Sequence, residues 1–290
     1  MSADRREKRP EYTVEESCAL LDFLLRSVKG LSRNSVKSLL TRGQVLVDGR
    51  AVTRHDHPLA PGQTVKITRA GAAETPPIIY EDAELVVIDK SAGLLAVATD
   101  AEKQKTAYRM LTDHVRESGG GRIFVVHRLD RDTSGVLLFA KNERIKRALQ
   151  DDWNSIVTER GYTAVVEGRP DEKRGVMRSW LRETKTHLVY CSATPGDGLE
   201  AVTRYEVTAW GPAYSLLDIR LETGRKNQIR AQLRELGHPV AGDKKYGAAT
   251  DPAKRLCLHA HTLALTHPFT GEELRFEAPT PGSFAALVRG

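Results

Sequence analysis

Chemically capable side chains are concentrated in one short segment of the chain, residues 127–135, which reads HRLDRDTSG. Apolar runs precede it at 124–126 and follow it at 136–139, and such runs predict β-strands. The segment is therefore expected to be a polar loop between two strands. Because strands hold a loop of this kind rigidly, it is the first candidate for a catalytic site.

Asp130 is the most reactive candidate in this loop, since a carboxylate can serve as a nucleophile, a general base or a metal ligand. The neighbouring cations Arg128 and Arg131 favour its ionised form, which suits an attacking anion better than a proton acceptor. Metal ligation needs further acids or histidines at set spacing, and no such array is evident. The residues alone leave open whether Asp130 reacts or only caps a turn by accepting hydrogen bonds from backbone amides.

The run from His127 to Gly135, followed by an apolar strand, resembles the central motif of the RluA-type pseudouridine synthases. In that family the aspartate that closes His-Arg-Leu-Asp is catalytic, which implies this role for Asp130. Four other polar residues of the motif are assigned to substrate binding, namely His127, Arg128, Arg131 and Thr133. For His127, acid–base assistance and bracing of the loop are alternatives.

Three further segments match the family in order and spacing, and each implies one site residue. The segment RGYTA at 160–164 implies an active-site tyrosine, Tyr162. The segment TGRKNQIR at 223–230 implies an arginine that pairs with the catalytic aspartate, Arg230. The segment LCLHA at 256–260 implies a leucine against the target base, Leu258. Arg225 and Gln228 are assigned to substrate binding. The resemblance covers residues 78–290.

The chain departs from the family at three places. Lys226-Asn227 stands where Thr-His is usual, Ala231-Gln232 where Val-His is usual, and Lys90-Ser91-Ala92-Gly93 where Lys-Pro-X-Gly is frequent. None of these changes removes the aspartate, the tyrosine or the arginine. They put in doubt which RNA is recognised more than whether the chemistry occurs.

The resemblance implies a defined chemistry: the bond from uracil nitrogen to ribose breaks, the base turns, and carbon-5 bonds to the same sugar carbon. No redox change occurs, so no cofactor is expected, and the sequence lacks a P-loop for a nucleotide cofactor. An extruded uracil fits between an aromatic ring and an aliphatic edge, which suits Tyr162 and Leu258. Arg230 is expected to keep Asp130 ionised and aimed.

The elements that position these residues alternate between strands and helices. Strands are predicted at 85–88, 124–126, 136–139 and 162–166, and helices at 106–116 and 227–236. A further helix, capped by Asn142, is expected to carry Trp153 on its apolar face. Because strands outnumber helices, we expect an α+β domain with a mixed or antiparallel sheet. Cys257, His259 and His261 alternate along a strand, but no fourth ligand is evident, so no metal site is predicted.

The first quarter of the chain has a different character. Its sequence pattern predicts two helices and a hairpin around Asp48-Gly49. Residues 20 to 54 contain seven basic residues and two acidic ones. This unit resembles the small α-L RNA-binding domain first known from the fourth small-subunit ribosomal protein. The resemblance implies RNA contacts by Arg33, Lys37 and Arg42, whereas the alternative is a solvated basic helix face.

Composition bounds the remaining possibilities. The 290 residues carry a net charge of +6, of which +4 falls in residues 1–75, and this favours a polyanionic partner such as structured RNA. Three distant cysteines imply no disulfide framework, and no apolar stretch is long enough for a signal peptide or a membrane span. We therefore expect a cytoplasmic protein. Its predicted parts are a flexible tail (1–11), the α-L domain (12–70), a linker (71–77) and the catalytic domain (78–290).

The sequence thus predicts an isomerase that converts uridines to pseudouridines in large-subunit ribosomal RNA. Transfer RNA is the alternative substrate for the same chemistry. From a different class, a non-catalytic RNA-binding ribosome-assembly factor is the competing hypothesis, although such a protein has no need of Asp130, Tyr162 and Arg230 together.

Overall fold

The computed structural model describes residues 11–28, 30, 32–41, 43–67, 75–100, 102–103 and 105–289. The chain divides into two compact units, residues 1–74 and 75–290. The predicted tail lies outside the described residues except for Glu11, which begins a strand, and residues 71–74 of the predicted linker lie outside them as well.

In its described residues, the first unit contains two small sheets and two helices. Its sheets have the orders β1-β6-β3-β4 and β2-β5, and its elements are β1 (Glu11–Thr13), β2 (Cys18–Ala19), α1 (Leu20–Ser27), α2 (Arg33–Thr41), β3 (Val45–Val47), β4 (Arg50–Ala51), β5 (Pro58–Leu59) and β6 (Thr64–Ile67). Leu24 and Val36, one from each helix, are fully buried in a shared apolar core. The predicted hairpin is confirmed: Asp48 and Gly49 both have positive φ, as a two-residue turn between β3 and β4 requires.

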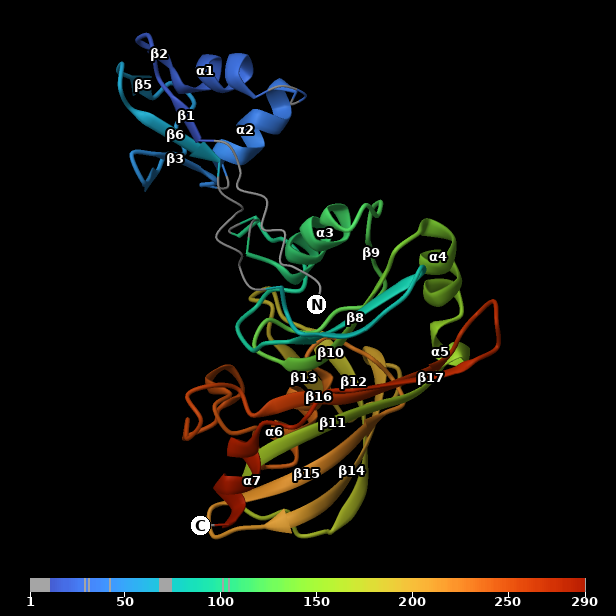
Figure 1. The fold of residues 1–290 in the computed structure, drawn as a ribbon. Helices are drawn as coiled ribbons and strands as arrows, with labels where there is room; N and C mark the ends of the chain where they lie inside the picture. The colour runs from blue at the N-terminus through green and yellow to red at the C-terminus, as the bar shows by residue number, and fades with distance from the viewer. Residues whose placement is uncertain are drawn as a thin grey trace, which may run out of the picture. The chain divides into compact units, whose positions relative to one another are not determined.

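The second unit is built on one 11-stranded sheet (Figure 1). Its order is β13-β12-β14-β15-β11-β16-β10-β8-β7, with β17 beside β16 and β9 beside β10. The bounds are β7 (Ile78–Glu81), β8 (Leu85–Lys90), β9 (Phe124–Val125), β10 (Ser134–Ala140), β11 (Val157–Glu167), β12 (Arg174–Glu183), β13 (Val189–Ser192), β14 (Leu199–Trp210), β15 (Tyr214–Leu221), β16 (Leu258–Thr266) and β17 (Glu273–Glu277). The β10–β16 pair is parallel and the other named pairs are antiparallel, so the predicted α+β fold with a mixed sheet is confirmed.

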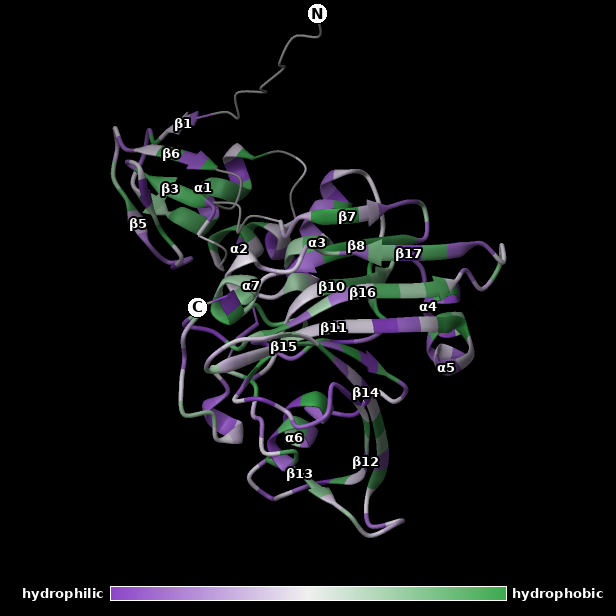
Figure 2. Ribbon diagram, turned by 90° about the horizontal axis from the view of Figure 1, so that it is seen from below, coloured by the Kyte–Doolittle hydropathy of each residue, from purple (hydrophilic) through white to green (hydrophobic). Residues whose placement is uncertain are grey.

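Strands β8 and β10 are buried on both faces, which explains why they read as continuous apolar runs. Helix α3 (Ala107–Glu117) packs on the face that carries Ile88 and Leu137, and helix α4 (Glu143–Asp151) packs on the opposite face with Val87 and Leu138. Figure 2 shows the hydrophobic colour along β8 and β16.

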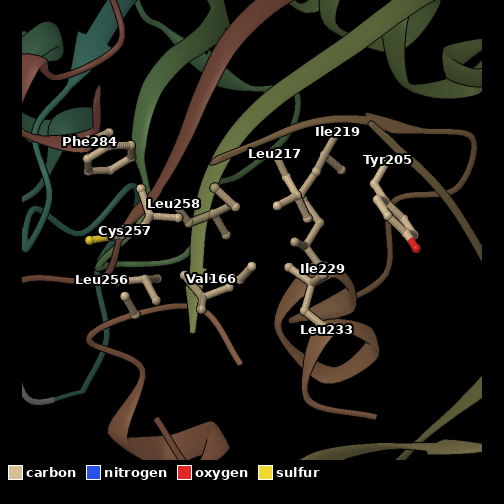
Figure 3. Packing of buried hydrophobic residues seen from close by; sticks show 14 of the residues in the cluster. Val166, Tyr205, Leu217, Ile219, Ile229, Leu233, Leu256, Cys257, Leu258 and Phe284 are labelled. Carbon is tan, nitrogen blue, oxygen red and sulfur yellow. The ribbon is translucent and has the colours of Figure 1, made fainter. Parts of the chain in front are cut away.

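The unit also contains α6 (Gln228–Glu235), α7 (Gly282–Arg289) and the 3₁₀ turn η1 (Lys244–Tyr246). Ile229 and Leu233 of α6 pack on Leu217 and Ile219 of β15, in the same core as Leu258 (Figure 3). The prediction for Trp153 was wrong in part. The helix that Asn142 caps ends at Asp151, and Trp153 begins a separate short helix, α5 (Trp153–Ile156), where it is half-buried.

Strand register places two of the predicted site residues on one face of the sheet. Tyr162 pairs with Ile219, and Ala164, two residues further on, pairs with Leu258. Side chains two residues apart in a strand point to the same face, so Tyr162 and Leu258 share the face on which α6 packs.

Gly135 allows β10 and β16 to approach each other directly after the 127–133 loop. It has φ +113°, and a Cβ there would lie 2.1 Å from the carbonyl oxygen of Ala260. We expect Gly135→Ala to lower the free energy of unfolding by about 3 kcal/mol, because positive φ and overpacking against backbone add. Urea unfolding followed by circular dichroism measures this. Gly121→Ala, at an open position without positive φ, is the matched control; equal effects of the two substitutions would contradict the explanation.

Candidate active site

Asp130 lies in the loop that runs from β9 to β10. Its side chain is 29% exposed, and its backbone oxygen accepts a hydrogen bond from the amide of Thr133 at 3.2 Å. The carboxylate is thus partly open to a ligand, while the backbone around it is turned tightly.

Lys90, at the end of β8, holds this loop from beneath. Its side chain is fully buried, and Nζ donates to three backbone oxygens, those of Ser91 (3.1 Å), Leu94 (2.9 Å) and Arg131 (3.0 Å). Burial lowers the pKa of Lys90 to about 8, against the nearby charges of Asp132 and Asp130. Lys90 belongs to the segment Lys90–Gly93, which departs from the family motif. Its role in holding the loop depends on the hydrogen bond to Arg131, 41 residues further along the chain, which the sequence does not reveal.

Arg230 approaches Asp130 from α6. Its Nη1 lies 3.5 Å from Oδ2 of Asp130, which is an ion pair but longer than a hydrogen bond of ordinary geometry. The principal partner of Arg230 is Asp243: Nε donates to Oδ2 at 2.6 Å and Nη2 donates to Oδ1 at 2.7 Å. This is a bidentate fork between two side chains that are 11% and 1% exposed.

Two further contacts complete the surroundings of the guanidinium. Nη1 donates to Oδ1 of Asn227 at 3.1 Å, and the group lies 4.8 Å from the ring centroid of Tyr246. Burial acts against the charged form, but the hydrogen bonds and charge of Asp243, with the charge of Asp130, raise the pKa of Arg230 above its usual range. Arg230 is therefore a permanent, immobile cation beside Asp130.

Asp243 and Asn227 were not among the predicted site residues. Asn227 adopts the left-handed conformation with φ +53°, which an asparagine tolerates better than most residues, at the position before α6 begins. Asp243 follows a glycine of positive φ, Gly242, and its side chain also accepts from the amide of Tyr246. Asp243 lies within residues 78–290, which the resemblance covers, but none of the motifs quoted for that resemblance contains it.

The face of α6 away from Arg230 is anchored by glutamines. Gln228 Nε2 donates to Val202 O (3.1 Å) and Thr203 Oγ1 (2.8 Å), while its Oε1 accepts from Thr223 and from the amide of Arg225. The amide group is thus saturated by protein partners. Gln228 was assigned to substrate binding, but the structure places it as a brace in the wall of the site.

Gln232, one of the departures from the family motif, has the same kind of environment. Its Nε2 donates to Ala201 O at 3.0 Å and to Ser179 Oγ at 3.0 Å, and its Oε1 accepts from Thr203 Oγ1 at 2.6 Å. Because every polar atom of this buried side chain has a partner, Gln232 ties α6 to β12 and β14.

The predicted site residues surround a cavity of about 350 Å³, a volume suited to a small ring. Eight of the predicted residues line it, namely Arg128, Asp130, Thr133, Tyr162, Arg225, Gln228, Arg230 and Leu258. Burial raises the pKa of Tyr162 to about 12, so its hydroxyl stays neutral near pH 7. The cavity therefore has one carboxylate, fixed cations, an aromatic ring and an aliphatic edge.

The other five predicted binding residues are not among those that line this cavity. Arg131 does not line this cavity and pairs with Asp132 at 3.0 Å. Arg33 and Lys37 are exposed on α2 of the first unit, and Arg42 lies outside the described residues. His127 does not line the cavity either.

His127 is instead a structural support for the loop. Its Nε2 accepts a hydrogen bond from the amide of Leu138 at 3.1 Å, and its ring lies 5.0 Å from that of Trp153. Burial, and to a smaller extent Arg160, lowers the pKa of His127 from 6.5 to about 4. The bracing alternative from the sequence matches these contacts.

The histidines near Cys257 have protein partners of their own. His259 Nδ1 is 2.8 Å from Ser134 Oγ, and His261 Nε2 is 2.9 Å from Asp218 Oδ1. Within the described ranges, no group of three or more potential ligands is arranged to hold a metal ion. Among those same residues, no helix is both long and apolar enough to cross a membrane.

Comparisons with known proteins define the class. The model of the RNA pseudouridylate synthase family matches residues 84–235, and the chain belongs to this family of RNA-modifying isomerases. An uncharacterized RNA pseudouridine synthase of Bacillus subtilis, YlyB, is 33% identical over 92% of this chain and 91% of its own length. The ribosomal large subunit pseudouridine synthase D of Nitrosomonas europaea is 33% identical over 96% of this chain and 87% of its own.

Solved structures agree on the fold. The human RNA pseudouridylate synthase domain containing 1 matches with a TM-score of 0.61 and 24% identity, over 74% of this chain and 87% of that chain. At this identity the match bears on the fold alone.

The environment of His127 predicts a specific acid sensitivity. A histidine whose folded pKa lies below its unfolded pKa contributes stability above pH 6.5, and this is lost as the pH falls toward 4. For this one group the loss between pH 7 and pH 5 is about 2 kcal/mol. His127→Gln keeps an acceptor for the amide of Leu138 and does not titrate. Between pH 7 and pH 5 we therefore expect the unfolding free energy of this variant, measured by urea titration, to fall by about 2 kcal/mol less than that of the wild type. Parallel pH profiles would contradict the assignment.

The fork on Arg230 predicts that Asp243 is needed for both stability and turnover. Asp243→Asn leaves a buried guanidinium without its principal charged partner, so we expect a loss of about 3 kcal/mol in unfolding free energy. In protein that is still folded, misplacement of Arg230 should lower kcat for pseudouridine formation about 100-fold. Asp197→Asn, which breaks a surface ion pair with Arg182, is the control and should be near neutral. Normal turnover by folded Asp243→Asn protein would refute the dependence.

Proposed function

We propose that this enzyme isomerises specific uridines of large-subunit ribosomal RNA, with Asp130 as the catalytic group. The observation that carries the chemistry is the partly exposed carboxylate of Asp130 in a cavity of suitable size, 3.5 Å from an immobile guanidinium. The choice of RNA is supported by the Nitrosomonas relative, whose name specifies the ribosomal large subunit and which matches both units of the chain.

In this proposal the target uridine leaves its helix and its base enters the cavity. Extrusion costs a few kcal/mol, which phosphate neutralisation by the basic surface offsets in part. Tyr162 and Leu258 lie on the same face of the sheet and both line the cavity, so they can contact the uracil ring. The neutral phenol of Tyr162 adds no charge beside the base.

Asp130 then acts at the ribose. As the bond from uracil nitrogen to the sugar breaks, positive charge develops on the sugar, and an ionised carboxylate stabilises that charge or bonds to the sugar carbon. The released base turns and bonds through carbon-5 to the same sugar carbon, whereupon the proton on carbon-5 is lost and the nitrogen gains one. Atoms and electrons balance without a cofactor. Arg230 places a positive charge beside Asp130 and, being held by Asp243, does not follow the substrate.

The first unit supplies a second grip on RNA in this proposal. Arg33 and Lys37 lie four residues apart on α2, hence on one face of the helix, and both are exposed. No side-chain ion pair to either is present among the described residues. Free basic side chains on one helix face suit a phosphate backbone.

The test is to map pseudouridines in total RNA from cells that carry the wild type, Asp130→Asn or no copy of the gene. We expect sites in large-subunit ribosomal RNA that vanish without the gene, and a loss of activity of about 1,000-fold or more for purified Asp130→Asn. The variant should still bind RNA. Asp197→Asn, at a surface ion pair whose aspartate lines neither the cavity around Asp130 nor the second one described below, is the matched control.

Each outcome is informative. Sites found only in transfer RNA would overturn the proposed substrate and leave the chemistry intact. Full activity of Asp130→Asn would overturn the catalytic assignment. An unchanged pattern of pseudouridines in cells without the gene would favour a non-catalytic factor.

A further inference from the structure

A second cavity, of about 420 Å³, lies next to the first, and Arg230 lines both. It is formed by the turn at 92–93, by the two residues that follow Asp130, and by segments between 242 and 256. Six basic side chains line it: Arg131, Arg230, Lys244, Lys245, Lys254 and Arg255. Nothing in the proposed chemistry uses this cavity.

The positive charge of this cavity is only partly neutralised from within. Its acidic residues are Asp132, Asp243 and Asp251, which leave a net charge of +3 on the lining. Each of these carboxylates is already paired, with Arg131 (3.0 Å), with Arg230 (2.6 Å) and with Lys244 (3.8 Å), respectively.

Among the residues that the structure describes, two lysines of this cavity have no acidic partner. Nζ of Lys245 donates to the backbone oxygen of His187 at 2.8 Å, which leaves its charge uncompensated, and Lys254 makes no side-chain hydrogen bond or ion pair among the described residues. A concave surface with this charge is suited to an anion.

The backbone of the cavity is fixed. Lys254 has φ +54°, an uncommon conformation for a lysine, and its amide donates to Asp251 O at 3.2 Å. A Cβ on Gly242 would lie 2.2 Å from Arg255 O, so the two segments that carry the basic residues are in direct backbone contact. Arg255 donates to Ser134 Oγ at 2.6 Å, which joins this wall to the start of β10. The basic side chains therefore extend from a preformed frame.

We propose that this basic cavity binds a backbone phosphodiester of the substrate RNA, one or two nucleotides from the uridine that reacts. The inference rests on the proposed function: with the base in the first cavity and the ribose at Asp130, the strand must continue across the adjoining surface. Arg131 directly follows Asp130, and Arg230 separates the two cavities, so a phosphate of a neighbouring nucleotide meets this basic lining. The contact fixes the register of the strand without reading its sequence.

The test compares two double variants, both in an Asp130→Asn background so that binding is measured without turnover. Lys244→Gln with Lys254→Gln removes two charges from the cavity. Lys173→Gln with Lys185→Gln is the matched control, because Lys173 also has one acidic partner at long range, Glu206 at 3.9 Å, and both lysines are exposed and line neither cavity. The probe is large-subunit ribosomal RNA transcribed in vitro, with Kd measured by filter binding between 50 and 200 mM salt.

We expect the cavity variant to bind about tenfold more weakly at low salt, and its slope of log Kd against log salt to fall by about one to two units, since each lost phosphate contact removes about one. The control pair should change the slope by much less. Equal effects of the two pairs would overturn the proposal. This readout does not need activity, so it remains decisive even if no pseudouridine is found.

A second arm separates RNA phosphate from free phosphate. Once the target uridine is mapped, short RNAs with a neutral methylphosphonate at single positions on either side of it are titrated. One such substitution should weaken binding by the wild type several-fold and by the cavity variant hardly at all. Inorganic phosphate is titrated at constant ionic strength. Displacement of RNA by millimolar inorganic phosphate, with no methylphosphonate position affected, would show a free-anion site and overturn the proposal.

Discussion

The bidentate pair of Arg230 and Asp243 is the interaction on which the rest of the site depends. A guanidinium and a carboxylate that are nearly removed from water are stable only if their hydrogen bonds are satisfied and well aligned. The fork to Asp243, with Asn227 as a third acceptor, meets that condition before Asp130 is considered at all. Arg230 therefore reaches Asp130 as a cation already fixed in position, and the carboxylate of Asp130 stays partly exposed for a substrate.

Several elements that are distant in sequence hold the Arg230–Asp243 pair and Asp130 in position. Gln228 and Gln232 bind α6 to the sheet through saturated amides, so the helix cannot shift along β14. On the other side, the buried amine of Lys90 fixes the loop that carries Asp130, at the cost of a depressed pKa. His127 supports the same loop from behind by accepting from Leu138. The site is thus preorganised by groups that never need to touch the substrate.

Much of this arrangement was accessible from the sequence. Buried runs such as 136–139, the Asp48-Gly49 turn, the helical pattern over 106–116 and the cap at Asn142 are local signals, and each led to the element that is present. The motif resemblance also selected Asp130, Tyr162, Arg230 and Leu258, which converge on one cavity. What could not be predicted depends on contacts between distant segments: the pairing of Asp243 with Arg230, the hold of Lys90 on residue 131, and the inward orientation of Gln228. A polar residue in a motif gives no indication of whether its partner is a ligand or a backbone carbonyl. The break after Asp151 was missed because one apolar periodicity continues across two helices.

The departures from the family motif can now be interpreted individually. Gln232 is 2% exposed and has protein partners on every polar atom, so it has no means of contacting RNA. Asn227 is turned toward Arg230, and its substitution belongs to the support of the guanidinium rather than to recognition. Lys226 and Asn227 both line the first cavity, but the side chain of Lys226 is half exposed and pairs with Glu183 on β12, a surface contact that a phosphate can replace. Of these three departures, the change at Lys226 is the one that adds a positive charge to the lining of the site.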